Sequence, residues 1–231
     1  MQNKIYFSIS KFDAIIDTVA GLGELEIYKK SPNLAHIAPI ERRRLSKGAR
    51  FCVSLLKEHE NLPVVFSSKH GEINRCFSLQ QSLAAYEPLS PASFCISVHN
   101  AIPAQNAIFS KNTAEISAIS ANLSLESGIL NAVMKFDENC DKVAVLSYFE
   151  AVNNELMQNG DLIYAVLVEV EKGENFSIEI SPNLEPNSNE NSINLTQNSD
   201  FEFLLNLQNH KKSWVVKEPN LSWKWVNETA I

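Results

Sequence analysis

AEISAISANLSLESGILNAVMKFDENCDKVAVLSYFE, residues 114–150, contains three segments with different apolar patterns. The short runs at 114–121 and 142–150 are rich in isoleucine, valine and alanine, which is typical of strands. Between them, residues 124–136 space their apolar side chains three and four positions apart, which predicts a helix. A strand, a helix and a second strand in this order predict an α/β fold.

Strand and helix patterns continue on both sides of this unit. Further strands are predicted at 4–9, 64–68 and 162–172, and 175–181 is predicted to pair with the last of them through a turn at Lys172 and Gly173. Further helices are predicted at 12–22, 40–60, 75–85 and 101–109, the last of them beginning after Asn100 as its cap. We therefore expect a sheet with helices on both faces.

The domain organisation follows from a change in composition near residue 180. Residues 1–180 are predicted to form the folded domain, and 181–200, rich in asparagine and serine with two prolines, a polar loop or linker. Residues 201–231 regain apolar character and contain all three tryptophans. Because tryptophan combines a large apolar area with one polar group, this segment is predicted to dock on the body or on a partner.

Composition and charge limit the possible partners. The chain has 231 residues and a formal charge of −7, with eleven acidic residues and one base, Lys172, between Val143 and Glu202. This balance argues against nucleic acid as the main partner. There is no apolar run of membrane-spanning length and no signal-peptide pattern at the start, so we expect no membrane span and a cytoplasmic location. Four scattered cysteines predict neither disulfides nor a metal site, and no cofactor motif is present.

SPASFCISVHNAIP, residues 90–103, raises the possibility of a Cys95–His99 dyad, as in an acyltransferase or thioesterase. The alternation at 93–100 predicts a strand, on which the two side chains would stand about 13 Å apart. A nucleophile and its base need about 3 Å between heavy atoms, so the pattern favours a packed thiol and a hydrogen-bonding histidine.

Two other polar groups have simpler interpretations. His70 and Glu72 flank Gly71, which is expected to supply a turn conformation rather than a catalytic base. Arg42, Arg43 and Arg44 are expected on a solvated helix face, with docking of an acidic carrier protein as the alternative.

Four blocks resemble a known family: PIERRRLSKGARFCV, VVFSSKHGEI, LSPASFCISVHNAI and ISANLSLESGILNAV. In this order they resemble the β-ketoacyl-synthase-like family of N-terminal domains, found in bacterial aryl-polyene and related type II polyketide or fatty-acid clusters. The resemblance covers about residues 35–170. It implies a thiolase-like half, with a mixed five-stranded sheet between helices.

The resemblance also implies where a nucleophile would stand, at a strand-to-helix turn. In this chain the corresponding position falls on Asn122, Leu123 or Leu125, and no cysteine occurs between Ile96 and Asn139. The second thiolase-like half, which supplies two histidines in ketosynthases, is expected to be missing as well. The chain then resembles chain-length-factor subunits, which do not catalyse condensation but pair with an active ketosynthase.

This interpretation predicts a full-length ketosynthase as partner, in a heterodimer or heterotetramer, with acyl carrier protein contacted indirectly. Ser97, His99 and Asn100 are predicted at the partner interface, with Phe94, Ile96 and Val98 buried against the sheet. Two alternatives stay open: an enzyme that uses Cys95 and His99, and a scaffold that docks acyl carrier protein.

Overall fold

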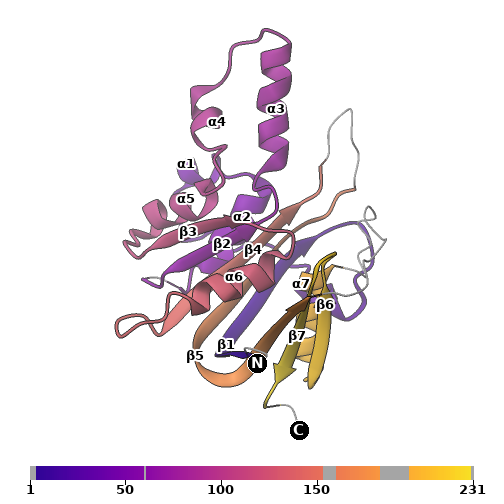
Figure 1. Cartoon of the computed structure of the whole chain (residues 1–231). Helices are drawn as coiled ribbons and strands as arrows, with labels where there is room; N and C mark the ends of the chain where they lie inside the picture. The colour runs from indigo at the N-terminus through magenta and orange to yellow at the C-terminus, as the bar shows by residue number, and fades with distance from the viewer. Residues whose placement is uncertain (1–3, 60, 153–159, 183–197, 230–231) are drawn as a thin grey trace.

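The computed structural model describes residues 4–59, 61–152, 160–182 and 198–229. Figure 1 shows the helices and strands, coloured by their position along the chain. The elements are β1 (Lys4–Asp17), η1 (Gly23–Tyr28), α1 (Pro39–Arg42), α2 (Lys47–Leu56), β2 (Val64–Ser68), α3 (Ile73–Ala84), α4 (Pro91–Cys95), α5 (Ala101–Ser110), β3 (Ile116–Ser120), α6 (Ser124–Val133), β4 (Lys142–Glu150), β5 (Ile163–Pro182), α7 (Ser199–Gln208), β6 (Ser213–Lys217) and β7 (Leu221–Asn227).

The sheet is mixed, and the described residues contribute seven strands to it rather than the expected five. Five of them follow the order β3-β2-β4-β5-β1, in which β2 is parallel to β3 and β4 while β5 is antiparallel to both β4 and β1. The other two, β7 and β6, continue from the second half of β5. The predicted α/β class is confirmed.

Helices cover both faces of the central strands, as predicted. Val143 and Val145 of β4 belong to a core that includes residues of α6 and α7. Ala144 and Leu146 of the same strand belong to a second core with residues of α2 and α5. Successive side chains of a strand point to opposite faces, so a nearly continuous apolar run is buried from both sides.

The predicted turn at Lys172 and Gly173 is wrong, because β5 runs through it as one strand of 20 residues. Its first part, Ile163–Glu171, pairs with β4 and its later part, Phe176–Pro182, pairs with β7, while β1 follows the opposite edge. Phe7 opposite Phe176 is followed by Ser8 opposite Glu171, so the intervening residues of β5 form a bulge. A Cβ at Gly173 would lie 1.9 Å from Ser8 Oγ, so this close approach requires glycine.

The predicted helix at 12–22 is also wrong, since β1 continues to Asp17. Ala14 and Ile16 enter the core under α6 and α7, whereas Ile15 enters the core under α2. A strand buried on both faces has neighbouring apolar residues without alternation, and over this short stretch their spacing imitates that of a helix.

The stretch at 93–100 is a short helix and a turn, not a strand. Pro91 occupies the first turn of α4, and the Ser90 hydroxyl caps it by accepting from Ser93 N–H at 3.3 Å. Together α3 and α4 extend from one end of the molecule, and we refer to residues 73–95 as the α3–α4 projection (Figure 1). No residue of either helix is buried.

The predicted long helix at 40–60 is divided into α1 and α2. The Ser46 hydroxyl accepts from Ala49 N–H at 3.1 Å and caps a new helix there.

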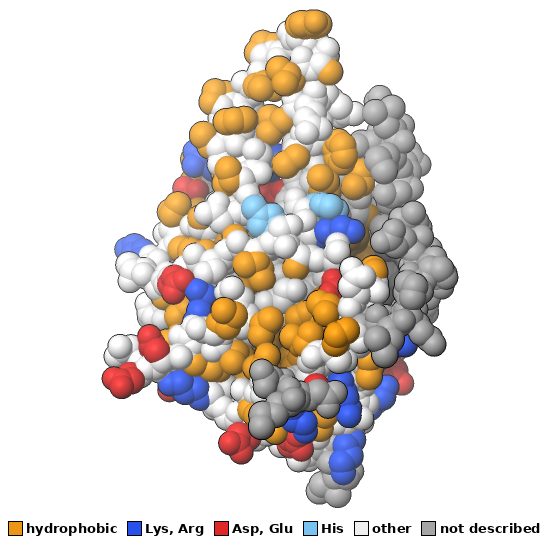
Figure 2. Space-filling model, viewed as in Figure 1, with side chains coloured by type: hydrophobic (Ala, Val, Ile, Leu, Met, Phe, Trp, Pro, Cys, Tyr) orange, Lys and Arg blue, Asp and Glu red, His pale blue; other side chains and the backbone are white. Residues whose placement is uncertain are grey.

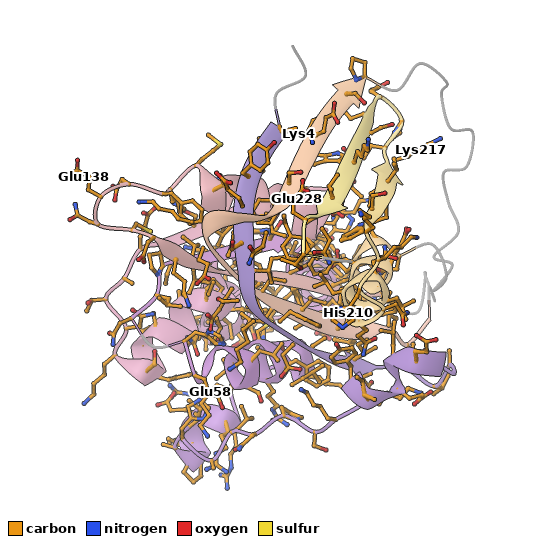
Figure 3. All side chains as sticks on the ribbon, turned by 90° about the horizontal axis from the view of Figure 1, so that it is seen from below. Lys4, Glu58, Glu138, His210, Lys217 and Glu228 are labelled. Atoms are coloured by element: carbon orange, nitrogen blue, oxygen red, sulfur yellow. The ribbon has the colours of Figure 1, made fainter. Side chains whose placement is uncertain are left out.

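Residues 198–229 fold onto the body as α7, β6 and β7. Figure 3 shows from below that Lys4 of β1, Lys217 of β6 and Glu228, one residue past β7, lie at the same end of the molecule. Trp225 is fully buried and stacks on Trp214 with ring centroids 5.3 Å apart. Most of the predicted linker 181–200 lies outside the described residues.

Candidate functional site

The turn between β3 and α6 holds the three positions at which the resemblance puts a nucleophile. Asn122 is exposed in the turn, Leu123 directly precedes α6 and is buried, and Leu125 is fully buried in the first turn of the helix. This turn lies at the carboxyl end of β3, beside the carboxyl end of β2. Ligands of open α/β sheets bind at such ends.

A carboxylate from the tail reaches this turn. Asp200, almost completely buried at the start of α7, accepts hydrogen bonds from the Leu125 backbone N–H and from Ser147 Oγ, the latter at 2.5 Å. Tyr164, whose hydroxyl accepts from Asn198 Nδ2 at 3.0 Å, also bonds to this carboxyl group. Burial raises the pKa of Asp200, although these hydrogen bonds oppose the increase.

Glu126 is a second buried carboxyl group at the same place. Its side chain is fully buried, and neither carboxyl oxygen has a hydrogen-bond partner among the described residues. Burial, followed by the nearby charge of Asp200, raises its pKa to about 8. The start of α6 therefore carries a buried carboxyl group whose protonated form is favoured, and it carries no cysteine.

Sequence reasoning missed Glu126 and Asp200 as a pair. Glu126 stands among buried residues of an apolar helix, which is an unusual place for a carboxyl group and could have drawn attention to it. Asp200 lies 74 positions later, and only the folded tail brings the two together.

The structure does not join Cys95 to His99. Cys95 is exposed at the end of α4, contrary to the expected packed thiol. His99 Nε2 lies 3.0 Å from the Ile119 carbonyl oxygen, and its ring meets Phe66 edge-on at 5.6 Å. His99 is therefore oriented toward β3 and the body, and the described residues show no hydrogen bond between it and Cys95.

The remaining residues of this stretch face outward more than expected. Phe94 and Val98 are exposed and Ile96 is half-buried, so their predicted burial against the sheet is wrong. The Ser97 hydroxyl donates to the Phe94 carbonyl at 2.8 Å. Asn100 directly precedes α5 but makes no side-chain capping bond.

Gly71 occupies the left-handed region at φ 61°, as its predicted turn role requires. Its N–H donates to Ser68 Oγ at 2.8 Å. The buried Glu72 carboxylate pairs with Arg75 at 3.2 Å. Burial, together with Lys69 and His99, lowers the pKa of His70.

The three arginines have different surroundings. Arg42 Nε donates to the Ile37 carbonyl at 2.5 Å and so holds the preceding loop. Arg44 lies 3.7 Å from Glu41, and Arg43 is exposed. Arg43 and Arg44 therefore present most of the charge of this segment to solvent.

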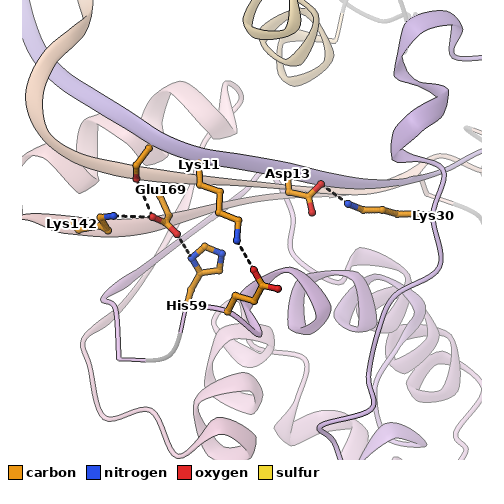
Figure 4. Close-up of polar contacts among 8 residues, drawn as sticks. Lys11, Asp13, Lys30, His59, Lys142 and Glu169 are labelled. Carbon is orange, nitrogen blue, oxygen red and sulfur yellow. Dashed lines mark hydrogen bonds and ion pairs between the residues drawn. The ribbon is translucent and has the colours of Figure 1, made fainter.

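A further polar cluster ties β1 and β5 to the chain after α2 (Figure 4). Glu169 lies 2.8 Å from His59 Nδ1 and accepts from Lys142 Nζ at 3.1 Å and Ser10 Oγ at 3.0 Å. Burial lowers the pKa of His59, although Glu169 opposes the decrease. We regard this cluster as structural, because its groups are used in joining these segments.

Two kinds of site are missing from the described part of the chain. It contains no group of three or more histidine, cysteine or acidic side chains able to hold a metal ion. None of its helices is long and apolar enough to cross a membrane.

Comparisons with known proteins identify the fold. Among solved structures, one chain of the complex between the ketosynthase ApeO and its chain length factor ApeC, from Xenorhabdus doucetiae, is similar. The TM-score is 0.79 and the identity 22%, over 96% of this chain and 99% of that one. A β-ketoacyl synthase from Burkholderia phymatum STM815 is similar with a TM-score of 0.53 and 11% identity, over 79% of this chain and 64% of that one. At these identities the likeness shows a shared fold.

No curated protein sequence matches the chain. The family model described as beta-ketoacyl synthase, N-terminal domain, matches residues 21–226. The chain therefore belongs to the β-ketoacyl synthase N-terminal-domain family.

Proposed function

We propose that the chain is a non-catalytic, chain-length-factor-like subunit that pairs with a full-length ketosynthase and supports acyl-chain elongation in the cytoplasm. The observation that carries this proposal is the exposed apolar surface of the α3–α4 projection and the segment after it.

The apolar side chains of this surface are large and well exposed. Figure 2 shows hydrophobic side chains gathered over the projection, at the top of the view. The exposed fractions are 63% for Leu83, 97% for Tyr86, 62% for Phe94, 56% for Val98 and 74% for Ile108. Contiguous apolar patches on a protein surface commonly mark an interaction site, because water is a poor solvent for them.

The edge of the sheet next to this surface supports the same proposal. β3 pairs with β2 along one side, and among the described residues its other side has no strand partner. His99 connects the two features, because it follows α4 and bonds to the Ile119 carbonyl of β3. An unpaired edge beside an apolar patch can bind another protein through both main-chain hydrogen bonds and side-chain packing.

The β3–α6 turn supports the absence of ketosynthase chemistry. Decarboxylative condensation needs a nucleophile that carries the acyl group and polar groups that stabilise the enolate. Here Leu125 is buried, and the protonated form of the adjacent Glu126 carboxyl group is favoured. This turn carries no cysteine, and the backbone N–H of Leu125 is already bonded to Asp200.

A ketosynthase partner is further supported by the similar structure, which by its description is a ketosynthase in complex with its chain length factor. We expect an interface of the obligate class, which would bury about 2,000 Å² or more.

Co-expression with the full-length ketosynthase encoded nearest to this chain tests the proposal. We expect the two proteins to co-purify in equal amounts, as measured by light scattering after gel filtration, and the chain alone to aggregate. Phe94→Asp combined with Tyr86→Asp should abolish the complex. Ile27→Asp is the matched control, since Ile27 is 65% exposed on η1. A monodisperse chain that ignores the ketosynthase would exclude this function.

A further inference from the structure

A hollow of about 400 Å³ lies on a part of the molecule that contributes nothing to the proposed interface. It is bounded by the end of β1, the segment after η1 and the first turn of α2. Ile16, Asp17, Lys29, Lys30, Pro32, Lys47, Arg50 and Phe51 are among the residues that line it. Its volume lies within the range of about 300–1,000 Å³ that is usual for small-molecule sites.

The lining of this hollow is strongly basic in a chain that is acidic overall. Four basic residues face a single acid, Asp17, whereas the whole chain has a charge of −7. The excess of basic over acidic lining residues makes the local potential more positive than that of the chain as a whole, although three of the four bases are ion-paired.

Each of the three lysines forms an ion pair with a carboxylate, and these pairs are at the surface. Lys47 pairs with Asp17, Lys30 with Asp13 and Lys29 with Glu26. Figure 4 shows the Lys30–Asp13 pair beside β1. In each pair both side chains are at least a quarter exposed, and ion pairs of this kind contribute little stability. Breaking these pairs should therefore cost little stability, although Lys29 Nζ also donates to the Ala20 carbonyl at 2.7 Å.

Arg50 provides an independent observation. Its Nε–H is buried and has no acceptor among the described residues, while Nη2 donates to the Arg42 carbonyl at 3.2 Å. The described part of the chain gives Arg50 no carboxylate partner. A buried unsatisfied donor is costly, and a guanidinium group binds a phosphate through two parallel hydrogen bonds.

We propose that this hollow binds the phosphate group of a small phosphorylated molecule. Arg50 and the lysines hold the phosphate, and the apolar side chains of Pro32 and Phe51 contact the organic part. The volume exceeds what a single phosphate ion needs, which favours a phosphate ester over the free ion. This inference is independent of the proposed function, because it uses no residue of the α3–α4 projection or of β3.

Isothermal titration calorimetry of the full chain, or of its ketosynthase complex, with phenyl phosphate, inorganic phosphate and phenol tests the proposal. We expect phenyl phosphate to bind best, inorganic phosphate more weakly and phenol not at all, with affinities that fall as salt increases. Equal binding of phenol and phenyl phosphate would overturn the phosphate assignment. Equal binding of phenyl phosphate and inorganic phosphate would contradict the proposed contact between Pro32, Phe51 and the organic part of the ligand. If neither compound binds, the whole proposal is wrong.

Variants assign the binding to this hollow. Arg50→Gln should weaken phenyl phosphate binding by about tenfold, since it removes one forked charge contact. The double variant Lys29→Gln, Lys30→Gln keeps the half-buried Arg50 and should weaken binding to a similar degree. The matched control is Arg43→Gln, an exposed charge that does not line the hollow. Unchanged affinity in both test variants would contradict the proposal, as would an equal loss in the control.

Discussion

The body of the molecule buries its apolar side chains, whereas the α3–α4 projection exposes them. β4 buries nearly all its residues between α2 on one side and α6 on the other, whereas α3 and α4 bury none of theirs. An apolar pattern in the sequence therefore predicts that the side chains are buried, but not whether they pack against this chain or against a partner. In the body this chain covers itself, and we propose that a ketosynthase covers the projection.

The largest expected effect comes from deleting a ring in the body. Trp225→Ala removes a fully buried side chain that packs on Trp214, Phe203 and Phe7. We expect it to lower the free energy of unfolding by about 4 kcal/mol in urea titrations. Tyr86→Ala, the corresponding deletion in the projection, should change it by less than about 0.5 kcal/mol. Similar losses in the two variants would contradict the comparison.

The next largest effect on stability is expected at Glu126, the buried carboxyl group of α6 that lies near Asp200 of α7. The pKa of Glu126 is raised to about 8, so the folded chain holds a proton that the unfolded chain releases above its ordinary carboxyl pKa. Stability should therefore fall as pH rises from about 5 to about 9. Glu126→Gln should remove on the order of 3 kcal/mol of this decrease, measured by urea unfolding at several pH values. Glu138→Gln, at an exposed carboxyl group, is the control, and parallel profiles for wild type and Glu126→Gln would refute this assignment.

A smaller effect is expected at Gly71, where the body joins the projection. Gly71 has a φ of 61°, and a Cβ there would lie 3.2 Å from His99 Nδ1. Gly71→Ala should cost about 1–2 kcal/mol and weaken ketosynthase binding, because it displaces the segment that carries His99. At Gly21 a Cβ would meet nothing within 4 Å, so Gly21→Ala is the control and should be neutral. If Gly71→Ala changes neither the free energy of unfolding nor ketosynthase binding, the proposed role of Gly71 in positioning His99 is wrong.

The smallest effect on stability is expected at the exposed arginines. Reversing Arg43 and Arg44 to glutamate should change the free energy of unfolding by less than about 0.5 kcal/mol. If this segment docks an acyl carrier protein, the double variant should weaken carrier binding to the complex by about tenfold in NMR titrations, without loosening the ketosynthase contact. Unchanged carrier binding would exclude the docking role.

Elements whose patterns were bounded by polar residues could be predicted from the sequence. β3, α6 and β4 lie at or within the expected ranges, because short apolar strands flank a helix with clear periodicity. The pattern failed at β1, where burial on both faces gave Phe12, Ala14, Ile15 and Ile16 a spacing that also fits a helix. It failed again at 93–100, where alternation came from a helix and a turn with exposed apolar residues.

The candidate site was less predictable than the fold. The resemblance pointed to the β3–α6 turn through Asn122, Leu123 and Leu125, but it gave no indication of the two carboxyl groups there. Glu126 and Asp200 meet only because α7 packs against α6, which is a tertiary event that no local pattern encodes. The same holds for Arg50, whose neighbours in the basic hollow come from three separate segments.

The pairing of β1 with β5 has a consequence for the order of folding. Lys4 is paired with Glu179, so the first described strand pairs with residues made about 175 positions later. During synthesis β1 must remain without this partner until almost the whole domain has emerged. Such distant pairings slow folding and leave apolar strands open to aggregation. The yield of folded protein should therefore be sensitive to temperature and protein concentration during synthesis, since both affect aggregation of the unpaired strand.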